Sequence, residues 1–304
     1  MNPQGGSELY YKNLLKNTGQ DWQQRINLVM SFCNLETIDP NRINVVLQEL
    51  MHNEGAVAGM DDPAYVDRMD HFVYVSQWQL DRFRERFNID HANNHVIRNA
   101  VPAISYVPKS KEKIRLIYTS TPYRGLDVLL DAFEMLNRDD IELHVYSSNV
   151  IYGTGYAKTI GSTFDHLFNR CRTMKNVVYK GWAMNKAIQQ AVQQAHIHAY
   201  PSTFEETSCM AVMETGMAGC KIVTTNLGAL PETCGPWATY VDYKYGDDRK
   251  QLVKNYAEVL NKEIDNYWTN THTLVNQSQW FNTQYSWESR TPEWLNFFNN
   301  ICVK

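Results

Sequence analysis

Residues 200–214 read Tyr200-Pro-Ser-Thr-Phe-Glu-Glu-Thr-Ser-Cys-Met-Ala-Val-Met-Glu214, a loop with an acidic pair that leads into a helix. Glu206 is expected at the mouth of this helix, and Glu214 about two turns inside it. Free backbone N–H groups at the start of a helix can hold phosphate oxygens. Glu206 can accept hydrogen bonds from sugar hydroxyls, and Glu214 can accept them from a ribose. The segment therefore predicts a binding site for a nucleotide sugar.

Strands and helices alternate around this segment. The sequence is strand-like at residues 114–118, 141–146, 177–179, 197–200 and 221–225. Between the strands, apolar residues recur at helical spacing. This alternation predicts a doubly wound parallel sheet, in which ligands bind outside the carboxyl ends of the strands.

The same alternation occurs in the first hundred residues. A glycine turn at Gly5-Gly6 precedes a helix for which Ser7 can serve as N-cap. Branched apolar residues predict buried strands at 25–32, 43–50, 71–76 and 95–98. The polar stretch Pro108-Lys-Ser-Lys-Glu-Lys113 has the composition of a linker, so a domain boundary is expected there.

Three distant segments together resemble the retaining GT-B glycosyltransferases of family 4, also called group 1. They are Pro201-Ser202 followed by Glu206-x7-Glu214, Ala218-Gly219 and Leu227-Gly-Ala-Leu-Pro-Glu232; Arg124-Gly-Leu-Asp-Val-Leu-Leu-Asp-Ala-Phe133; and Tyr285-Ser-Trp-Glu288. Their order and spacing agree with the family over residues 114–304. The resemblance implies an α/β protein with the GT-B fold, in which two Rossmann-like, doubly wound parallel-sheet domains face each other across a cleft.

The resemblance also implies the domain organisation. Residues 1–108 are expected to form the acceptor-side domain and residues 114–274 the nucleotide-sugar-binding domain. Residues 275–304 are expected to form a helix that crosses back to the first domain. Relatives begin with an apolar strand before the glycine turn, and this sequence begins almost at the turn. Two alternatives follow: the first domain is a shortened version, or the start lies downstream of the natural one.

Three residues are expected to act in catalysis. Arg124 lies in the turn after the strand at 114–118, where its guanidinium can bind phosphate oxygens in bidentate fashion. Glu206 gives the family spacing to Glu214 and is expected to orient the sugar, although the neighbouring Glu205 leaves the register open. His52 is similar to a histidine that lies near the transferred sugar in relatives. Each residue also has an ordinary structural interpretation. Arg124 would then be an exposed loop arginine, Glu206 a solvated acid, and His52 a hydrogen-bonded histidine near a strand end.

Twelve further residues are expected to bind the donor. One group is expected to contact the phosphates from loops and from the start of the helix. The other group is expected to contact the base and follows other strands of the sheet. They are Gly5, Gly6, Ser7, Ser120, Gly125, Ser147, Gly181, Trp182, Thr207, Ser208, Cys209 and Glu214.

The basic residue that relatives carry a few positions before Arg124 is missing. Thr119, Ser120 and Thr121 stand there, and a hydroxyl can donate a hydrogen bond but supplies no charge. The site therefore works with one cation, or Arg98 or Lys180 contributes a second. The sequence has no Asp-x-Asp triplet, and neither a metal ion nor any other cofactor is expected.

Composition excludes several classes of protein. The formal net charge is −4 over 304 residues and no Lys/Arg block stands out, which argues against nucleic-acid binding. The six cysteines show no zinc-site spacing and are expected to be reduced. No apolar run approaches the roughly 18 residues of a transmembrane helix. A cytoplasmic protein is expected, with a peripheral membrane contact left open.

These features predict an enzyme of glycan biosynthesis. It would transfer a hexose or pentose from a nucleoside diphosphate sugar to a saccharide, lipid-linked or other hydroxyl acceptor, and the resemblance implies retention at the anomeric carbon. A non-catalytic protein that binds a nucleotide sugar or a glycan is the alternative. The shortened start and the missing second cation motivate it.

Overall fold

The computed structural model describes residues 6–269 and 271–302, and the side chains at 151–154, 156 and 157 are outside that description. Gly5, one of the expected donor-binding residues, therefore lies outside the described part. The chain divides into two compact units. Residues 6–101 and 284–302 belong to the first unit, and residues 102–283 belong to the second.

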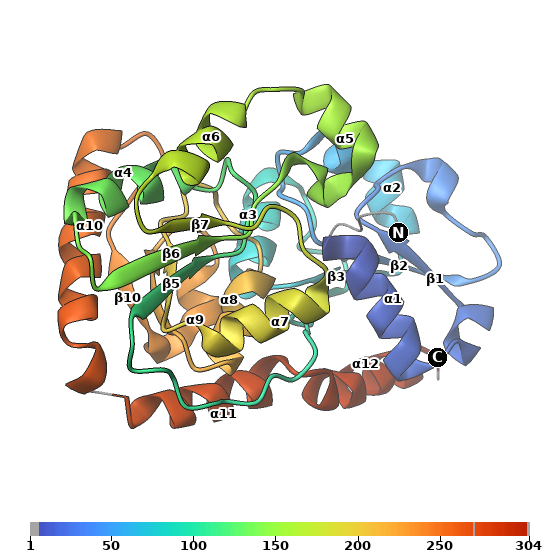
Figure 1. The fold of residues 1–304 in the computed structure, drawn as a ribbon. Coiled ribbons are helices and arrows are strands. Elements are labelled where there is room, and N and C mark those ends of the chain that lie inside the picture. Colours follow the sequence, from blue (N-terminus) through green and yellow to red (C-terminus); the bar gives the residue numbers. More distant parts are fainter. Residues whose placement is uncertain (1–5, 270, 303–304) are drawn as a thin grey trace. The chain divides into compact units, whose positions relative to one another are not determined.

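The first unit is built on a parallel sheet of four strands in the order β1-β2-β3-β4 (Figure 1). The strands are β1 (Ile26–Met30), β2 (Ile43–Gln48), β3 (His71–Tyr74) and β4 (Asn94–Val96). Its α-helices are α1 (Gly6–Thr18), α2 (Pro63–Arg68), α3 (Gln77–Arg86) and α12 (Trp287–Cys302), and its 3-10 turns are η1 (Asp21–Gln24), η2 (Leu35–Thr37) and η3 (Gly55–Asp61).

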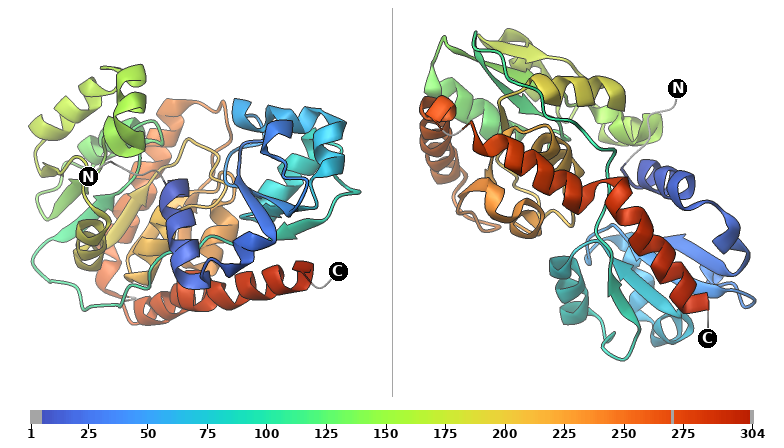
Figure 2. Two further views of the ribbon diagram at one scale, coloured as in Figure 1. Left: turned by 90° about the vertical axis from the view of Figure 1, so that its right-hand side faces the viewer. Right: turned by 90° about the horizontal axis from the view of Figure 1, so that it is seen from below.

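Side chains that alternate along β2 supply two cores. Val45 and Leu47 pack into the cluster that contains α1 and α12, whereas Val46 packs into the cluster that contains α2 and α3. This alternation follows from the two-residue period of a strand. The first and last helices, α1 and α12, lie side by side (Figure 2). Trp294 of α12 donates a hydrogen bond to the hydroxyl of Tyr10 of α1 over 2.9 Å, which ties the two helices together.

The second unit has six parallel strands in the order β10-β9-β8-β5-β6-β7. The strands are β5 (Ile114–Tyr118), β6 (Ile141–Val145), β7 (Val177–Tyr179), β8 (Ile197–Tyr200), β9 (Lys221–Thr225) and β10 (Ala238–Val241). The chain builds outward from β5 to β7 and then returns to place β8 on the other side of β5. This reversal between β5 and β8 is the point at which doubly wound sheets bind ligands.

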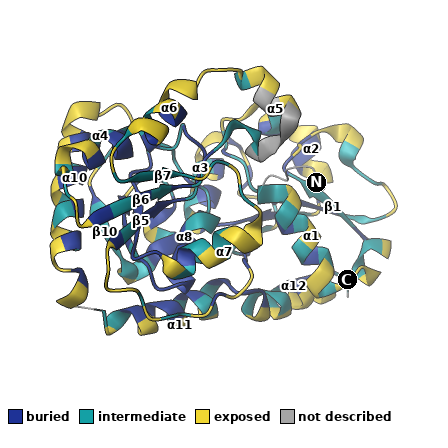
Figure 3. Cartoon of the chain, viewed as in Figure 1, coloured by how far each residue is buried: buried dark blue, intermediate teal, exposed yellow. Residues whose placement is uncertain are grey.

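Helices cover both faces of this sheet, and the central strands β5, β8 and β9 are mostly buried (Figure 3). They are α4 (Leu126–Leu136), α5 (Gly153–Ile160), α6 (Asp165–Thr173), α7 (Asn185–Gln194), α8 (Met210–Met217), α9 (Leu230–Cys234), α10 (Arg249–Asp265) and α11 (Thr273–Tyr285), with the turns η4 (Asn149–Tyr152), η5 (Gly235–Trp237) and η6 (Tyr267–Thr269). The prediction of two α/β units, each with a parallel sheet, is confirmed.

Candidate functional site

The carboxyl ends of β5 and β8 bring the expected arginine and glutamate together. Arg124 lies in the turn that connects β5 to α4, and Glu206 lies in the loop that connects β8 to α8. Nη1 of Arg124 is 2.9 Å from each carboxylate oxygen of Glu206. The side chain of Glu206 is only 4% exposed and that of Arg124 is 21% exposed. A carboxylate at this depth needs a charged partner, and Arg124 supplies it.

Aromatic rings flank the arginine. Cζ of Arg124 lies 4.6 Å from the centre of the Phe204 ring and 5.7 Å from the centre of the Tyr123 ring. Stacking on a ring face favours a guanidinium and restricts its plane. Two contacts therefore hold the guanidinium of Arg124: the carboxylate of Glu206 and the ring of Phe204.

A third side chain, Tyr200 at the end of β8, completes this cluster. Its hydroxyl donates a hydrogen bond to Oε1 of Glu206 and lies 3.5 Å from Oγ of Ser120. Tyr200 is fully buried. Sequence reasoning missed it because an aromatic residue in a strand is typical of a core.

Two glycines allow neighbouring loops to approach the loop that carries Glu206: Gly125 in the turn after β5 and Gly228 in the loop after β9. Gly125 has a φ of +95°, and a Cβ placed on it would lie 2.0 Å from the carbonyl oxygen of Pro201. Gly228 has a φ of +63°, and a Cβ there would lie 2.6 Å from the backbone N of Glu206. Both positions require a residue without a side chain. The loop is further fixed by Ala229, whose N–H donates to the carbonyl oxygen of Glu206 over 2.7 Å.

Helix α8 begins without a capping side chain. Its N-cap is Cys209, which has no oxygen to cap the helix and makes only a thiol contact with the backbone of Val212 in the first turn. Thr207 and Ser208 are half-buried and lead into this turn. The start of α8 therefore has the character of an anion-binding site.

Glu214 lies in the second turn of α8. Burial raises the pKa of this half-buried carboxyl from its ordinary value of 4.5 to about 7. None of the residues that the structure describes donates a hydrogen bond to its side chain. Ionisation of a carboxyl without hydrogen-bond donors lowers the stability of the folded protein, unless a ligand supplies hydroxyl donors.

Three further hydroxyl oxygens near the carboxyl ends of β5 and β6 are buried without a hydrogen-bond partner in the described part of the chain. They belong to Thr119, Thr121 and Ser147. Thr121 is 3% exposed and Ser147 is 1% exposed. Buried hydroxyls are nearly always satisfied in native proteins, so these three are available to a ligand or to water.

The turn after β7 contains the residues expected near a base. Gly181 has a φ of +65°, and Trp182 next to it is 40% exposed. The turn is anchored to the sheet because the N–H of Lys180 donates to the carbonyl oxygen of Val145 over 2.9 Å. Trp182 thus offers an exposed ring at the carboxyl end of the strand next to β6.

The remaining expected residues belong to the first unit. Ser7 lies in the first turn of α1 beside Gly6, and its side chain is hydrogen-bonded to Glu49, whose pKa burial raises to about 7. The ring centre of His52 lies 6.5 Å from that of Phe83. Gly6, Ser7 and His52 thus belong to the first unit, whereas Arg124 and Glu206 belong to the second.

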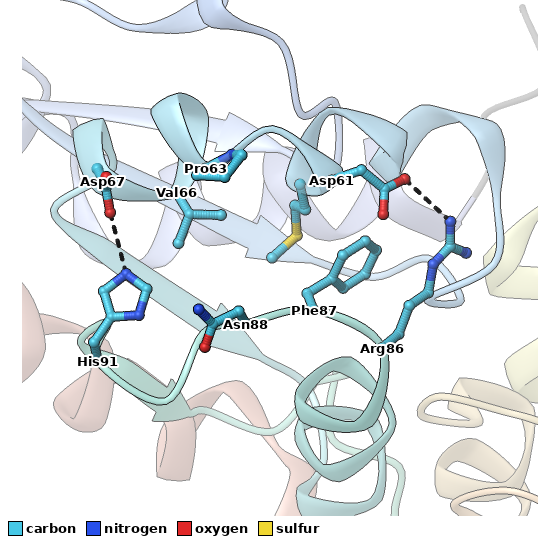
Figure 4. A pocket seen from close by; sticks show the side chains of 9 residues that line it. Asp61, Pro63, Val66, Asp67, Arg86, Phe87, Asn88 and His91 are labelled. Carbon is cyan, nitrogen blue, oxygen red and sulfur yellow. Dashed lines mark hydrogen bonds and ion pairs between the residues drawn. The ribbon is translucent and has the colours of Figure 1, made fainter.

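The first unit also carries a surface hollow of about 280 Å³ between η3, α2 and the end of α3 (Figure 4). Asp61 and Arg86 pair at one end over 3.4 Å, and Asp67 and His91 pair at the other over 3.2 Å. None of the residues expected to act in catalysis or binding lines it.

Among the residues that the structure describes, no three His, Cys, Asp or Glu side chains gather as metal ligands. In the same part of the chain, none of the helices is long and apolar enough to cross a membrane.

Residues 100–273 match the family model described as "Glycosyl transferases group 1", which is more than half of the chain. No curated protein matched the sequence.

Solved structures share the fold at low identity. The pneumococcal O-GlcNAc transferase GtfA, in complex with UDP and GlcNAc, is 14% identical with a TM-score of 0.65 and covers 95% of this chain and 60% of its own. TarM is 17% identical with a TM-score of 0.65 and covers 96% and 58%. Sucrose-phosphate synthase from Thermosynechococcus elongatus is 12% identical with a TM-score of 0.69 and covers 97% and 79%. The likeness shows the GT-B fold.

The chain spans 58% to 61% of the length of the first three such structures.

Proposed function

Because the chain belongs to the group 1 glycosyl transferases, we propose that it transfers a sugar from a nucleoside diphosphate sugar to a hydroxyl acceptor. One observation carries the proposal. A paired Arg124 and Glu206 lie at the strand-order reversal of the second sheet, in the loops next to the uncapped start of α8. This arrangement offers positive charge, N–H donors and a carboxylate to a single ligand.

The departing diphosphate gains negative charge as the glycosyl bond breaks, so it needs donors that are already in place. Arg124 supplies a guanidinium, and the first turn of α8 supplies backbone N–H groups. The buried hydroxyls of Thr119 and Thr121 add neutral donors in the loop where relatives carry a second basic residue. No metal ion or other cofactor enters this proposal.

Glu206 is proposed to hold the donor sugar. A carboxylate has about four acceptor positions. Two hydrogen bonds from Arg124 and one from Tyr200 occupy three of them. The fourth position can accept a sugar hydroxyl, which agrees with a role in orienting the sugar without attacking it.

Glu214 is proposed to bind the ribose, because it lacks described donors and a ribose offers two hydroxyls. Ser147, Gly181 and Trp182 are proposed to surround the base. The donor's own phosphate is proposed to take the acceptor's proton, which gives retention at the anomeric carbon. A hexose or a pentose fits this chemistry, and so does a saccharide or lipid-linked acceptor.

The six cysteines are free thiols. Because disulfides are rare in reducing compartments, this supports the proposal that the protein works in the cytoplasm.

A second candidate function is nucleotide-sugar or glycan binding without catalysis. Arg124 is the cation in the cluster, and its charge is matched by that of Glu206. Ser120 occupies the position where relatives have a further basic residue. A site with so little net positive charge could hold a donor without stabilising a departing diphosphate.

A donor panel tests the proposal. UDP-, GDP- and ADP-sugars are compared in thermal unfolding, and one nucleotide class is expected to raise the Tm, by an amount set by its concentration and Kd. Hydrolysis of that donor, measured as nucleoside diphosphate release, is expected from the enzyme. Stabilisation without hydrolysis in the presence of any acceptor would favour the binding protein instead, and the absence of stabilisation by all three classes would refute both.

Glu214→Gln is expected to stabilise the unliganded protein at high pH. Below pH 4.5 the carboxyl is protonated in both folded and unfolded states; between 4.5 and about 7 the folded state binds more protons, so the free energy of unfolding falls as pH rises. Glutamine cannot ionise, so it removes this loss of stability, which is on the order of 3 kcal/mol at pH 8. Denaturant unfolding at pH 4.5 and pH 8 measures the difference.

The same variant is expected to bind the nucleoside diphosphate about tenfold more weakly, through loss of a hydrogen bond to a charged group. Glu258→Gln, an exposed acid on α10, is the matched control and should change neither quantity. If Glu214→Gln destabilised the protein at pH 8, the carboxyl would already have a partner.

A further inference from the structure

Tyr200 is one of the most firmly held side chains near the cluster. It ends β8, which lies between β5 and β9 in the sheet. Its ring stacks on that of His198 at 5.3 Å between centres and 6° between planes, and lies 5.8 Å from that of Tyr118. His198 is itself fixed by a hydrogen bond of 2.9 Å to Oγ1 of Thr215 in α8. The hydroxyl of Tyr200 is therefore a fixed point.

The hydroxyl acts as a donor at all ordinary pH values. Burial raises the pKa of Tyr200 well above its usual value, and the negative charge of Glu206 adds to that effect. A protonated phenol donates to a carboxylate, which matches the hydrogen bond to Oε1 of Glu206.

Glu206, in contrast, is carried by a loop. Its side chain is held by Arg124 and Tyr200, which are its partners among the described residues. Glu206 accepts from one nitrogen of Arg124, Nη1. A diphosphate that binds the same guanidinium shares its positive charge with Glu206 and so weakens the hold of Arg124 on the carboxylate. The hydrogen bond from Tyr200 does not depend on Arg124 and still fixes Glu206.

We infer that Tyr200 is a positioning residue: its hydroxyl keeps the Glu206 carboxylate oriented toward the donor sugar while Arg124 is engaged by the diphosphate. The inference rests on the proposed function of this site. Tyr200 then affects turnover through Glu206 and does not itself contact the donor.

Tyr200→Phe tests the inference because it removes only the hydroxyl. With the donor found in the panel, kcat for hydrolysis is expected to fall about tenfold, the effect of one hydrogen bond to a charged group. The Kd of the free nucleoside diphosphate should stay within threefold, since that ligand has no sugar for Glu206 to hold. On a Glu206→Gln background, the same change should lower kcat less than twofold.

A purely structural role gives another result. Tyr10→Phe is the control, because it removes a buried tyrosine hydroxyl that is hydrogen-bonded to Trp294 in the first unit. If Tyr200→Phe lowered the Tm like Tyr10→Phe and left kcat unchanged, the inference would be wrong. Equal losses in kcat and in nucleoside diphosphate affinity would also overturn it.

A crystal structure of Tyr200→Phe with the nucleoside diphosphate bound, so that Arg124 is engaged, separates this inference from the proposed function. The Glu206 carboxylate is expected to leave its single position or to occupy more than one. A carboxylate unmoved from its wild-type position would refute the positioning role, whether or not the protein hydrolyses any donor. Failure of every donor with wild-type protein would instead refute the proposed function.

Discussion

Arg124→Ala is expected to lower kcat/KM for donor turnover by about 2 to 4 kcal/mol, or roughly 30- to 1000-fold. The reason is that Arg124 is the cation that lies in the cluster at the carboxyl ends of β5 and β8. The hydroxyls of Thr119, Ser120 and Thr121 cannot replace its charge. Steady-state kinetics with the donor identified in the panel measures the loss.

Removal of Arg124 also leaves Glu206 buried without its charged partner, which destabilises the fold. The double variant Arg124→Ala/Glu206→Gln also removes the buried charge at position 206. It should therefore recover stability without recovering activity. Arg249→Ala is the matched control: Arg249 pairs with Asp127 and Asp131 of α4 at 2.7 Å, and it is 47% exposed. It should leave kcat/KM unchanged. Normal turnover by Arg124→Ala would remove this residue from the site.

Gly125→Ala is expected to destabilise the second unit and to abolish the close contact between its two loops. A Cβ at this position would lie 2.0 Å from the carbonyl oxygen of Pro201, and the φ of +95° is unfavourable for alanine. The backbone conformation costs about 1 to 2 kcal/mol, and relief of the overlap about 1 to 3 kcal/mol more. Denaturant unfolding measures the sum, and donor binding should weaken with it.

Gly246→Ala separates the two causes. Gly246 has the same φ of +95°, but a Cβ there would meet nothing within 4 Å. This variant should lose only the cost of the backbone conformation and should keep full donor binding. If both variants lost the same stability, the contact between Gly125 and Pro201 would not matter.

Much of the second unit could be predicted from the sequence. Apolar runs mark β5, β6 and β8, and helical spacing of leucines marks α4, because burial on both faces of a parallel sheet demands continuous apolar strands. The two residues on which the site depends, Arg124 and Glu206, follow two of these strands directly. Their place at one edge of the sheet therefore follows from local pattern and from the rules of parallel sheets.

Tyr200 could not be predicted in the same way. In sequence it is an aromatic residue at the end of a strand, which is typical of a core residue. Its contact with Glu206 depends on where the loop after β8 turns back, and that path is set by Gly228 and Ala229, which follow β9. The role of Tyr200 depends on the path of this loop, so the sequence around position 200 does not indicate it.

The sequence by itself determined the alternation of strands and helices, the order of the motifs and the family, since each of these depends on neighbours along the chain. Only the tertiary structure decided that Arg124 binds Glu206 directly, although 82 positions separate them. The sequence suggested separate partners for the two, phosphate for one and sugar for the other. The physical reason is that a buried carboxylate pairs with the cation that the folded sheet brings close to it. The distance between the Arg124 guanidinium and the Glu206 carboxylate is set only when the chain folds.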